Sequence, residues 1–429
     1  MNRILQILCA AALVALPAAS VQADIDPCAP TPSSNELCKV VEEGPYLGTS
    51  QRGIKLSGYV DAGYQYNFNS DQGANNSIYI QSFGHKPYTD TRPRGDFDLN
   101  AIKLALEKPL SDANELQAGF RIDVMMGEDA GSIGGRNNGL PDLSSLSDDI
   151  FLEQAFVQFR VPWGNGLDFK VGKFVSPLGY EVIERPANLN ISYGNLWTQM
   201  PHWYTGVMAS YKFNDIVDAK FGVVNGWDTD NNLGGGYFVN GNDVADGAAL
   251  VGTVNLTAPG GNANLQNGFY YGINSQDQFA QFLLSSDNGH VFVWDLWGNW
   301  VPKFADDRLL LGFNTIFGNA TITTLVDGDT TTWFGAALYA KYQFTDIFSL
   351  AGRFDYMHND DAGKFGNDFN RQNVDIWSWT LTAGFDIIEN MMLRAEYRMD
   401  IGEDIEGFDN VDSHDGPSHQ VTAEVVYSF

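Results

Sequence analysis

Long stretches of this chain alternate between apolar and polar residues with a period of two. From Ile54 to Phe68 the even positions are apolar or small, and the odd positions are mostly polar. Successive side chains of a β-strand point to opposite faces, so this pattern predicts a strand with one apolar and one polar face. Such a strand suits a soluble sheet whose apolar face covers a core. It equally suits a membrane barrel whose apolar face meets lipid and whose polar face lines a wet lumen.

The same alternation recurs along the chain and predicts sixteen strands. They cover residues 54–68, 96–108, 115–128, 150–161, 167–174, 203–213, 217–227, 245–256, 265–274, 289–301, 308–317, 332–344, 348–358, 375–387, 391–401 and 418–429. In 96–108 the apolar phase shifts between Ala101 and Ile102, which indicates a β-bulge. Short and long connections alternate, as in an up-and-down barrel whose rims face different compartments. An even number of strands places both ends of the barrel on the rim with short turns.

The N-terminus predicts export. A short charged start, Met1 to Arg3, precedes a mostly apolar run and a small-residue cleavage site at Val21-Gln22-Ala23, so residues 1–23 are predicted to be a secretory signal peptide. No later stretch reaches the ~18 uninterrupted apolar residues of a membrane helix. A mature protein that spans a membrane must then be a closed barrel, because lipid does not tolerate open sheet edges. We expect residues 24–52 to form a periplasmic segment and residues 53–429 to form the barrel.

The C-terminus, "HQVTAEVVYSF", stops on an aromatic residue. Tyr427 and Phe429 share the apolar phase of the last predicted strand. This ending resembles the signal by which the barrel assembly machinery recognises outer-membrane barrels, and we predict that role for these two residues. The alternative is a soluble strand that happens to be last.

Charge patterning favours the barrel over a soluble sandwich or propeller. Charged residues fall in the polar phase of nearly every predicted strand, and Glu153 and Lys173 are the exceptions. A soluble sheet would show the same segregation. Sixteen strands in one exported chain fit a barrel better, and that number is large enough to enclose an aqueous channel. The predicted fold class is therefore an all-β, transmembrane, antiparallel up-and-down β-barrel with short periplasmic turns and long external loops.

Composition narrows the candidate chemistry. The formal net charge is −28, which disfavours nucleic acid as a partner. After removal of the signal peptide only Cys28 and Cys38 remain, and in an oxidising periplasm they either form a disulfide or stay as two free thiols. The sequence contains no CxxC, HExxH or Cys/His cluster, so we expect no metal, haem or other cofactor.

Two stretches carry a resemblance to a known family. They are "GFRIDVMMGEDAG" from Gly119 to Gly131 and "EQAFVQFRVPWGNGLDFKVGKFVSPLGYEVIERPANLNIS" from Glu153 to Ser192. They resemble the putative β-barrel porin family of the OmpL-like type, and "GKFVSPLGYE" within the second is also similar to phosphate-selective porins. The resemblance implies an outer-membrane pore of a Gram-negative bacterium, with about sixteen strands and a homotrimeric assembly. Phosphate-selective barrels depend on dense basic ladders, whereas the inward charges here are mixed in sign, so anion specificity is not expected.

The resemblance also implies a constriction. Porins commonly fold their third external loop into the lumen, and that loop here runs from Val175 to His202 with Glu181, Glu184 and Arg185 as its charged residues. The expected pore wall consists of inward charges, namely Asp61, Arg121, Asp123, Lys170, Lys212, Arg353, Arg394 and Arg398. The alternative, compatible with the first reading, is that the loop charges pair with the wall and brace the barrel.

These features predict a passive diffusion channel for small hydrophilic solutes or ions, with a weak cation preference that follows from the acidic balance. Lipopolysaccharide and outer-membrane lipid are its expected surroundings. A surface adhesin or receptor, or a purely structural outer-membrane barrel, is the alternative function, and the carboxylate-rich stretch "GEDIEGFDNVDSHDG" is its main support. An outer-membrane hydrolase needs a reactive His-Ser-Asp arrangement. The sequence offers only adjacent residues near His414 and His419, so we predict no enzyme.

Overall fold

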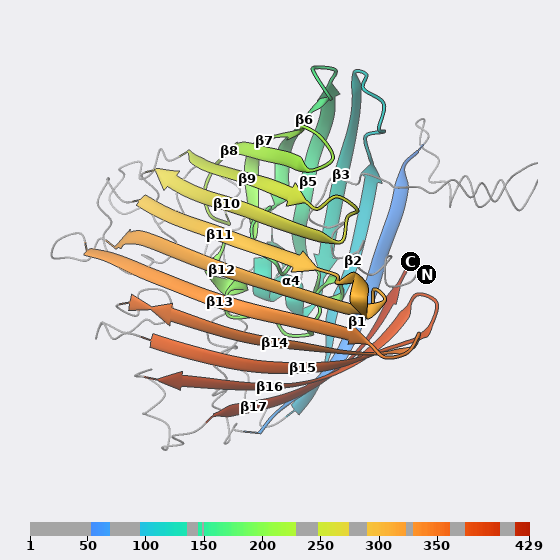
Figure 1. Cartoon of the computed structure of the whole chain (residues 1–429), viewed down its shortest axis with the longest axis vertical. Helices are drawn as coiled ribbons and strands as arrows, with labels where there is room; N and C mark the ends of the chain where they lie inside the picture. Colours follow the sequence, from blue (N-terminus) through green and yellow to red (C-terminus); the bar gives the residue numbers. More distant parts are fainter. Residues whose placement is uncertain are drawn as a thin grey trace, which may run out of the picture.

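Sixteen antiparallel strands form a closed ring in the computed structural model (Figure 1). The structure describes residues 53–68, 95–134, 145–147, 150–228, 248–273, 290–322, 329–360, 374–403 and 417–429. The ring strands are β1 (Lys55–Asn67), β2 (Gly95–Lys108), β3 (Gln117–Met126), β5 (Ile150–Val161), β6 (Leu167–Val175), β7 (Trp203–Lys212), β8 (Val217–Val224), β9 (Ala249–Thr257), β10 (Ala263–Ile273), β11 (His290–Trp300), β12 (Leu309–Ile322), β13 (Asp329–Gln343), β14 (Phe348–Asn359), β15 (Val374–Ile388), β16 (Met391–Glu403) and β17 (Ser418–Ser428).

Each ring strand pairs with the next one along the chain, and the first pairs with the last. The seam between β1 and β17 runs from Tyr59 opposite Ser428 to Asn67 opposite Gln420. At its end, Gly58 and Phe429 exchange two main-chain hydrogen bonds of 2.9 Å each. Because the seam is paired, the ring has no free edge, as a lipid environment requires.

Short elements occupy the connections. The helix α4 (Glu128–Gly134) and the three-residue strand β4 (Ser145–Ser147), which pairs with the start of β5, follow β3. Two 3-10 turns, η1 (Arg185–Ala187) and η2 (Trp197–Gln199), lie between β6 and β7, and η4 (Lys303–Ala305) lies in a short turn. Among the described residues no helix is both long and apolar enough to cross a membrane.

The sixteen predicted strands are confirmed, with differences at their ends. The predicted strand 217–227 ends at Val224, and the connection between β12 and β13 is only residues 323–328 because both strands extend further than the alternation indicated. Short and long connections alternate along the ring. The short ones include residues 162–166, 213–216 and 389–390, and the long ones include residues 176–202. The rim with the short connections is the one that faces the periplasm in outer-membrane barrels.

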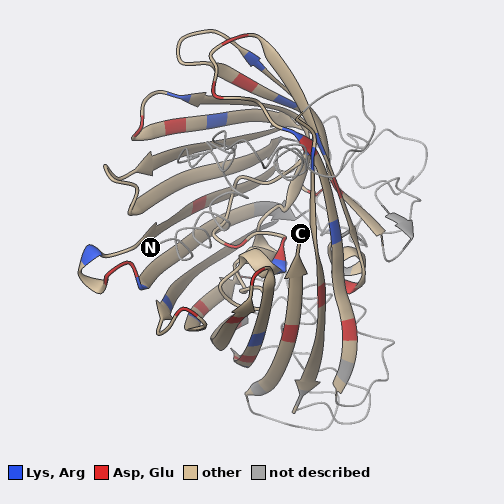
Figure 2. Cartoon of the chain, turned by 90° about the vertical axis from the view of Figure 1, so that its right-hand side faces the viewer, with Lys and Arg blue, Asp and Glu red and all other residues tan. Residues whose placement is uncertain are grey.

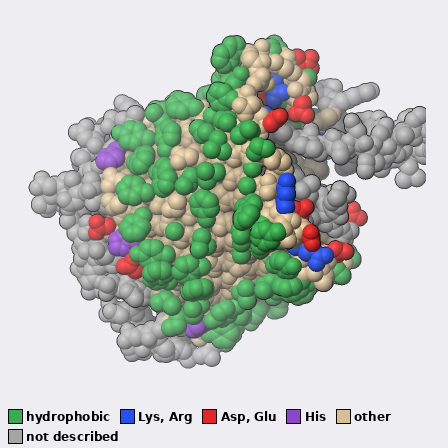
Figure 3. Space-filling model, viewed as in Figure 1, with side chains coloured by type: hydrophobic (Ala, Val, Ile, Leu, Met, Phe, Trp, Pro, Cys, Tyr) green, Lys and Arg blue, Asp and Glu red, His purple; other side chains and the backbone are tan. Residues whose placement is uncertain are grey.

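The apolar phase of the strands faces outward. Leu56, Val60, Ile122, Leu338 and Leu381 are each more than a third exposed. Hydrophobic side chains are spread widely over the face of the barrel that Figure 3 shows. Figure 2 shows charges of both signs on the strands. Inward charges such as Asp123, Arg353 and Arg398 are almost completely buried. The polar faces therefore point into the barrel, where other parts of the chain cover them.

Bulges explain two of the irregular places in the pattern. In the pairing of β1 with β2, Asp61 lies opposite Ala101 and Gly63 lies opposite Asp98, so β2 contains one extra residue. This bulge lies just before Ala101, next to the phase shift that the sequence predicted. The pairing of β3 with β5 moves from Asp123–Gln154 to Val124–Leu152, which makes Glu153 the extra residue of β5. A bulge turns its side chain out of the regular alternation, and Glu153 is fully buried instead of facing lipid.

Candidate functional site: a loop inside the barrel

The connection of residues 176–202, called the lumen loop below, lies inside the barrel, and every one of its residues is buried or half-buried. Its base is closed by a hydrogen bond from the Ser176 N–H to the His202 carbonyl (2.8 Å). Gly179 has a φ of +89°, a conformation that residues with a Cβ rarely adopt. The side chain of Asn188 closes the first turn by bonding the main-chain N–H and carbonyl of Val182 at 2.9 and 2.8 Å.

One end of the lumen loop packs on β10 to β13. The Gly179 N–H donates to the Asp295 carboxylate at 2.9 Å, and the Gln266 amide donates to the Pro177 carbonyl at 2.6 Å. The ring of Tyr180 stacks on Tyr339 with ring centres 4.3 Å apart. Polar main-chain groups at this end of the loop are thus satisfied by inward side chains of the wall.

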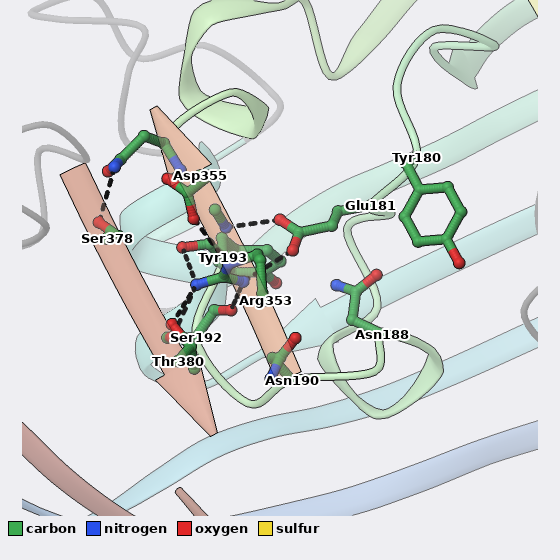
Figure 4. Close-up of polar contacts among 12 residues, drawn as sticks. Tyr180, Glu181, Asn188, Asn190, Ser192, Tyr193, Arg353, Asp355, Ser378 and Thr380 are labelled. Atoms are coloured by element: carbon green, nitrogen blue, oxygen red, sulfur yellow. Dashed lines mark hydrogen bonds and ion pairs between the residues drawn. The ribbon is translucent and has the colours of Figure 1, made fainter. Parts of the chain in front are cut away.

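Arg353 on β14 holds the middle of the loop (Figure 4). Its guanidinium donates to the Glu181 carboxylate at 2.7 Å and to its strand neighbour Asp355 at 2.9 Å. It also donates to the carbonyls of Ser192 (2.6 Å) and Tyr193 (3.2 Å). Burial raises the pKa of the Glu181 carboxyl, although Arg353 and the Gly194 N–H oppose this rise.

Two further arginines and a glutamate on β16 bind main-chain groups of the loop. Arg394 donates to the carbonyls of Asn188 (2.9 Å) and Arg185 (3.1 Å) and pairs with Glu424 on β17 (2.5 Å). Arg398 donates to the Tyr193 carbonyl at 2.6 Å and pairs with Asp400. Between them the Glu396 carboxylate accepts from the loop N–H groups of Ile191 (2.6 Å) and Ser192 (3.0 Å). The loop is therefore hydrogen-bonded along its length to β14 and β16.

The opposite side of the loop contacts the first strands. The ammonium of Lys103 on β2 lies 2.9 Å from Glu184, 2.5 Å from Glu153 and 3.3 Å from Asp123. Burial acts to raise the pKa of Glu184, but the ammonium of Lys103 outweighs it and holds that pKa below its usual range. Arg185 pairs with Asp129 of α4, with a contact of 3.0 Å at its Nε. These pairs join the loop to β2 and to α4 on its second side.

Aromatic rings fill the centre of the arrangement. Tyr193 and Trp197 stack with ring centres 4.0 Å apart, and the Trp197 ring lies 3.8 Å from His202. Ile183, Tyr193 and Trp197 share one buried cluster with Phe151 and Trp203 of the wall. The loop therefore has an apolar core as well as ion pairs, which is why it keeps a defined position within a polar lumen.

The residues expected in the pore have distinct environments. Glu181, Glu184 and Arg185 come together in the lumen loop, and each has a partner of opposite charge outside the loop. Asp61 is buried and accepts from the Asn100 amide at 2.8 Å. Asp123, Arg353, Arg394 and Arg398 are buried where the loop meets the wall. Glu181 and Glu184 thus have partners on the wall, as the bracing alternative expects, whereas Arg185 pairs with α4.

A second group of expected wall residues keeps contact with solvent. Arg121 has a side chain 25% exposed and pairs with Asp123 at 2.9 Å. Lys170 is half-buried, with its ammonium 4.7 Å from the centre of the Phe156 ring. Lys212 is 59% exposed at the end of β7, where it pairs with Asp215 of the short turn. Lys212 therefore belongs to the periplasmic rim.

The structure describes the residues of the predicted terminal signal but not the predicted cysteine pair. Tyr427 and Phe429 are 49% and 51% exposed, in the outward phase at the rim. Cys28 and Cys38 lie outside the described residues.

Sequence reasoning missed Lys103 and Asp129 as partners of the loop. The bulge beside Ala101 puts Lys103 in the inward phase, so the phase shift in this strand was a usable signal. The oxygen atoms of Asp123, Glu153 and Glu184 lie within 4.8 Å of one another, a grouping seen in cation sites. Here the ammonium of Lys103 contacts all three carboxylates.

Comparison with known proteins agrees with this architecture. The model of the family described as "Putative beta-barrel porin-2, OmpL-like" matches residues 53–429. No curated protein sequence matches the chain. The solved structures of the outer-membrane channel DcaP of Acinetobacter baumannii and of the anion-selective porin from Comamonas acidovorans are 12% and 11% identical, each with a TM-score of 0.56. Each alignment covers 88% of this chain, with 97% of the first and 99% of the second structure.

OmpT of Vibrio cholerae, solved in a trimer form, is 11% identical with a TM-score of 0.51, and the alignment covers 88% of this chain and 99% of that one. At these identities the structures establish a shared barrel fold, and the family match establishes the relationship. The chain therefore belongs to the putative β-barrel porin-2, OmpL-like family of outer-membrane porins.

Proposed function

We propose that this outer-membrane porin is a passive diffusion channel for small hydrophilic solutes or ions. The observation that carries the proposal is a closed ring of sixteen strands with an apolar outer face and charges of both signs inside. Rings of this size enclose an aqueous lumen, and a loop folded into that lumen narrows it. Glu181, Glu184 and Arg185 on the lumen loop would then border the constriction.

The solvent-accessible charges favour one side of the lumen as the path. Among the described residues, Arg121, Arg160, Asp168 and Lys170 keep partial contact with solvent on β3, β5 and β6. The inward arginines of β14 and β16 are covered by the loop. We therefore place the permeation path along the wall from β3 to β6.

A weak cation preference follows from the balance of charge. The chain has 53 acidic and 25 basic residues. The pairing of Glu181 with Arg353 and of Glu184 with Lys103 weakens their own contribution, because each local field is partly cancelled. Acidic vestibules still concentrate cations in front of the constriction, and this effect fades when salt screens it.

Changing Glu181 and Glu184 together to Gln should shift selectivity towards anions. The two substitutions leave Arg353 and Lys103 with fewer negative neighbours, and buried charges act strongly on nearby ions because water screens them little. We expect the cation-to-anion permeability ratio, measured as zero-current potential in a salt gradient, to fall by roughly a factor of two or more. The paired control, Asp215→Asn with Asp346→Asn, removes two carboxylates from exposed turns and should leave the ratio nearly unchanged. Equal potentials for both double variants would place the loop away from the ion path.

A structural or adhesive barrel is the alternative function. The observation in its favour is the number of contacts between the lumen loop and both sides of the wall, which would suit a closed, braced barrel. Single-channel recording separates the two, because a braced barrel without a passage gives no conductance steps.

The proposal also covers the assembly and processing of the protein. We propose a homotrimer, for which the trimer form of V. cholerae OmpT is the supporting observation. We also propose that residues 1–23 are removed as a signal peptide and that residues 24–52 remain in the periplasm with a Cys28–Cys38 disulfide. Recognition of Tyr427 and Phe429 by the assembly machinery, and contact with lipopolysaccharide, belong to the same proposal.

A further inference from the structure

His202, the last residue of the lumen loop, makes hydrogen bonds through both ring nitrogens. Its Nδ1 lies 3.0 Å from Oδ2 of Asp228, and its Nε2 lies 2.9 Å from the main-chain carbonyl oxygen of Trp197. The side chain of His202 is 2% exposed, and that of Asp228 is fully buried. Neither ring nitrogen is therefore positioned to exchange these partners for bulk water.

Both partners are acceptors, which determines the charge of the ring. A carboxylate and a main-chain carbonyl have no hydrogen to donate, so each ring nitrogen must carry one, and only the imidazolium form does. The other oxygen of Asp228 accepts the N–H groups of His202 (2.6 Å) and Trp203 (3.1 Å). Two main-chain donors favour the ionised form of Asp228. The ring of Trp197, 3.8 Å away, adds a favourable surface for a cation.

Among the described residues, the charged groups placed around this pair come from three parts of the fold. Asp228 follows β8 and supplies the negative charge. Lys173 of β6 places its ammonium 5.0 Å from the Trp203 ring centre, on the side of β7. On the loop, Arg185 lies 5.7 Å from the ring centre of Tyr193, which stacks on Trp197. The carboxylate of Asp228, in direct contact, stabilises a positive charge on His202. The two cations, which would destabilise that charge, are separated from His202 by aromatic rings.

We propose that His202 is a positioning residue whose imidazolium form fixes the second half of the lumen loop to the end of β8. The hydrogen bond to the Trp197 carbonyl connects η2 to Asp228, and Trp197 stacks on Tyr193, whose carbonyl is bound by Arg353 and Arg398. Loss of the proton removes one of the two hydrogen bonds and the charge attraction to Asp228. The loop segment around η2 then moves more freely, so the channel becomes pH-sensitive at this point.

The protonation state can be read without any channel activity. In the folded full-length protein with ¹⁵N-labelled histidine, we expect both ring nitrogens of His202, assigned by their loss in His202→Gln, to be protonated at about pH 6. Asp228→Asn should lower the midpoint of the His202 titration by about one pH unit or more, because it removes the stabilising negative charge. A neutral His202 ring at about pH 6, or an unchanged midpoint in Asp228→Asn, overturns the proposal.

The consequence for conductance rests on the proposed channel function. Open-channel current noise of the wild type should rise several-fold from about pH 6 to about pH 9, whereas His202→Gln should be noisy and independent of pH throughout. His358→Gln is the matched control, since His358 also contacts a carboxylate, Asp375 at 2.9 Å, but on the strands β14 and β15. It should keep the wild-type profile. A wild-type profile in His202→Gln contradicts the positioning role. Absence of all conductance would contradict the channel function and leave the ¹⁵N result to decide the charge of His202.

Discussion

Replacing Arg353 by Met should release the middle of the lumen loop and raise single-channel conductance several-fold. The guanidinium is fully buried, and it bonds the Glu181 carboxylate, two loop carbonyls and Asp355. Methionine fills a similar volume but satisfies none of these groups. Removal of one partner from a buried ion pair typically destabilises a protein by about 3–5 kcal/mol, because the remaining charge is left unpaired. We therefore expect the free energy of unfolding of Arg353→Met to fall by about that amount.

Two measurements check this expectation. The temperature at which the folded, fast-migrating band disappears in heat-modifiability gels should fall markedly, and bilayer recordings should show larger, noisier openings. Arg308→Met, which removes the same charge from an exposed position at the short-turn rim, should change neither quantity. A folded Arg353→Met barrel with wild-type conductance would show that this arginine does not position the loop in the permeation path.

Deletion of Phe429 should reduce the assembled protein in the outer membrane to a small fraction of the wild-type level. The deletion removes the two hydrogen bonds that Phe429 exchanges with Gly58 at the seam, together with a terminal ring that is half exposed. Unpaired main-chain groups at a strand edge are costly in a membrane. The ring itself is the expected recognition feature for the assembly machinery.

Substitution separates the two contributions. Phe429→Asp keeps the main-chain pairing with Gly58 and changes only the ring, so a loss close to that of the deletion assigns the effect to recognition of the ring. Phe304→Ala, in the exposed turn η4 of the same rim, is the control and should assemble normally. Normal surface levels of Phe429→Asp, measured by quantitative blotting of outer-membrane fractions, would contradict the recognition role.

The strands were predictable because a membrane barrel constrains both of their faces. Lipid excludes charge from one face, and a wet interior accepts it on the other, so the alternation persists through sixteen strands with little interruption. One exception was informative. Glu153 appeared to face lipid, and the structure resolves this with a bulge that turns it into the lumen beside Lys103.

The partners of the lumen loop were much less predictable. Glu181 and Arg353 are separated by 172 residues, and the Asn188 carbonyl and Arg394 by 206. Nothing in the spacing of the sequence indicates such pairs, because they form only when the ring closes around the loop. Main-chain acceptors carry no side-chain signature either, so the contacts of Arg394 and Arg398 with loop carbonyls had no signal. The charged residues of the loop were recognised, but their pairing was an open alternative until the wall positions were known.

The central claim, that the barrel encloses a water-filled passage, is tested most directly by single-channel recording of the purified, heat-modifiable protein in a planar bilayer. We expect discrete current steps whose size varies linearly with voltage. In a salt gradient we expect a small zero-current potential whose sign indicates cation preference, and this potential should become smaller at high salt. Correctly folded protein that inserts into the bilayer and gives no conductance steps would contradict the account.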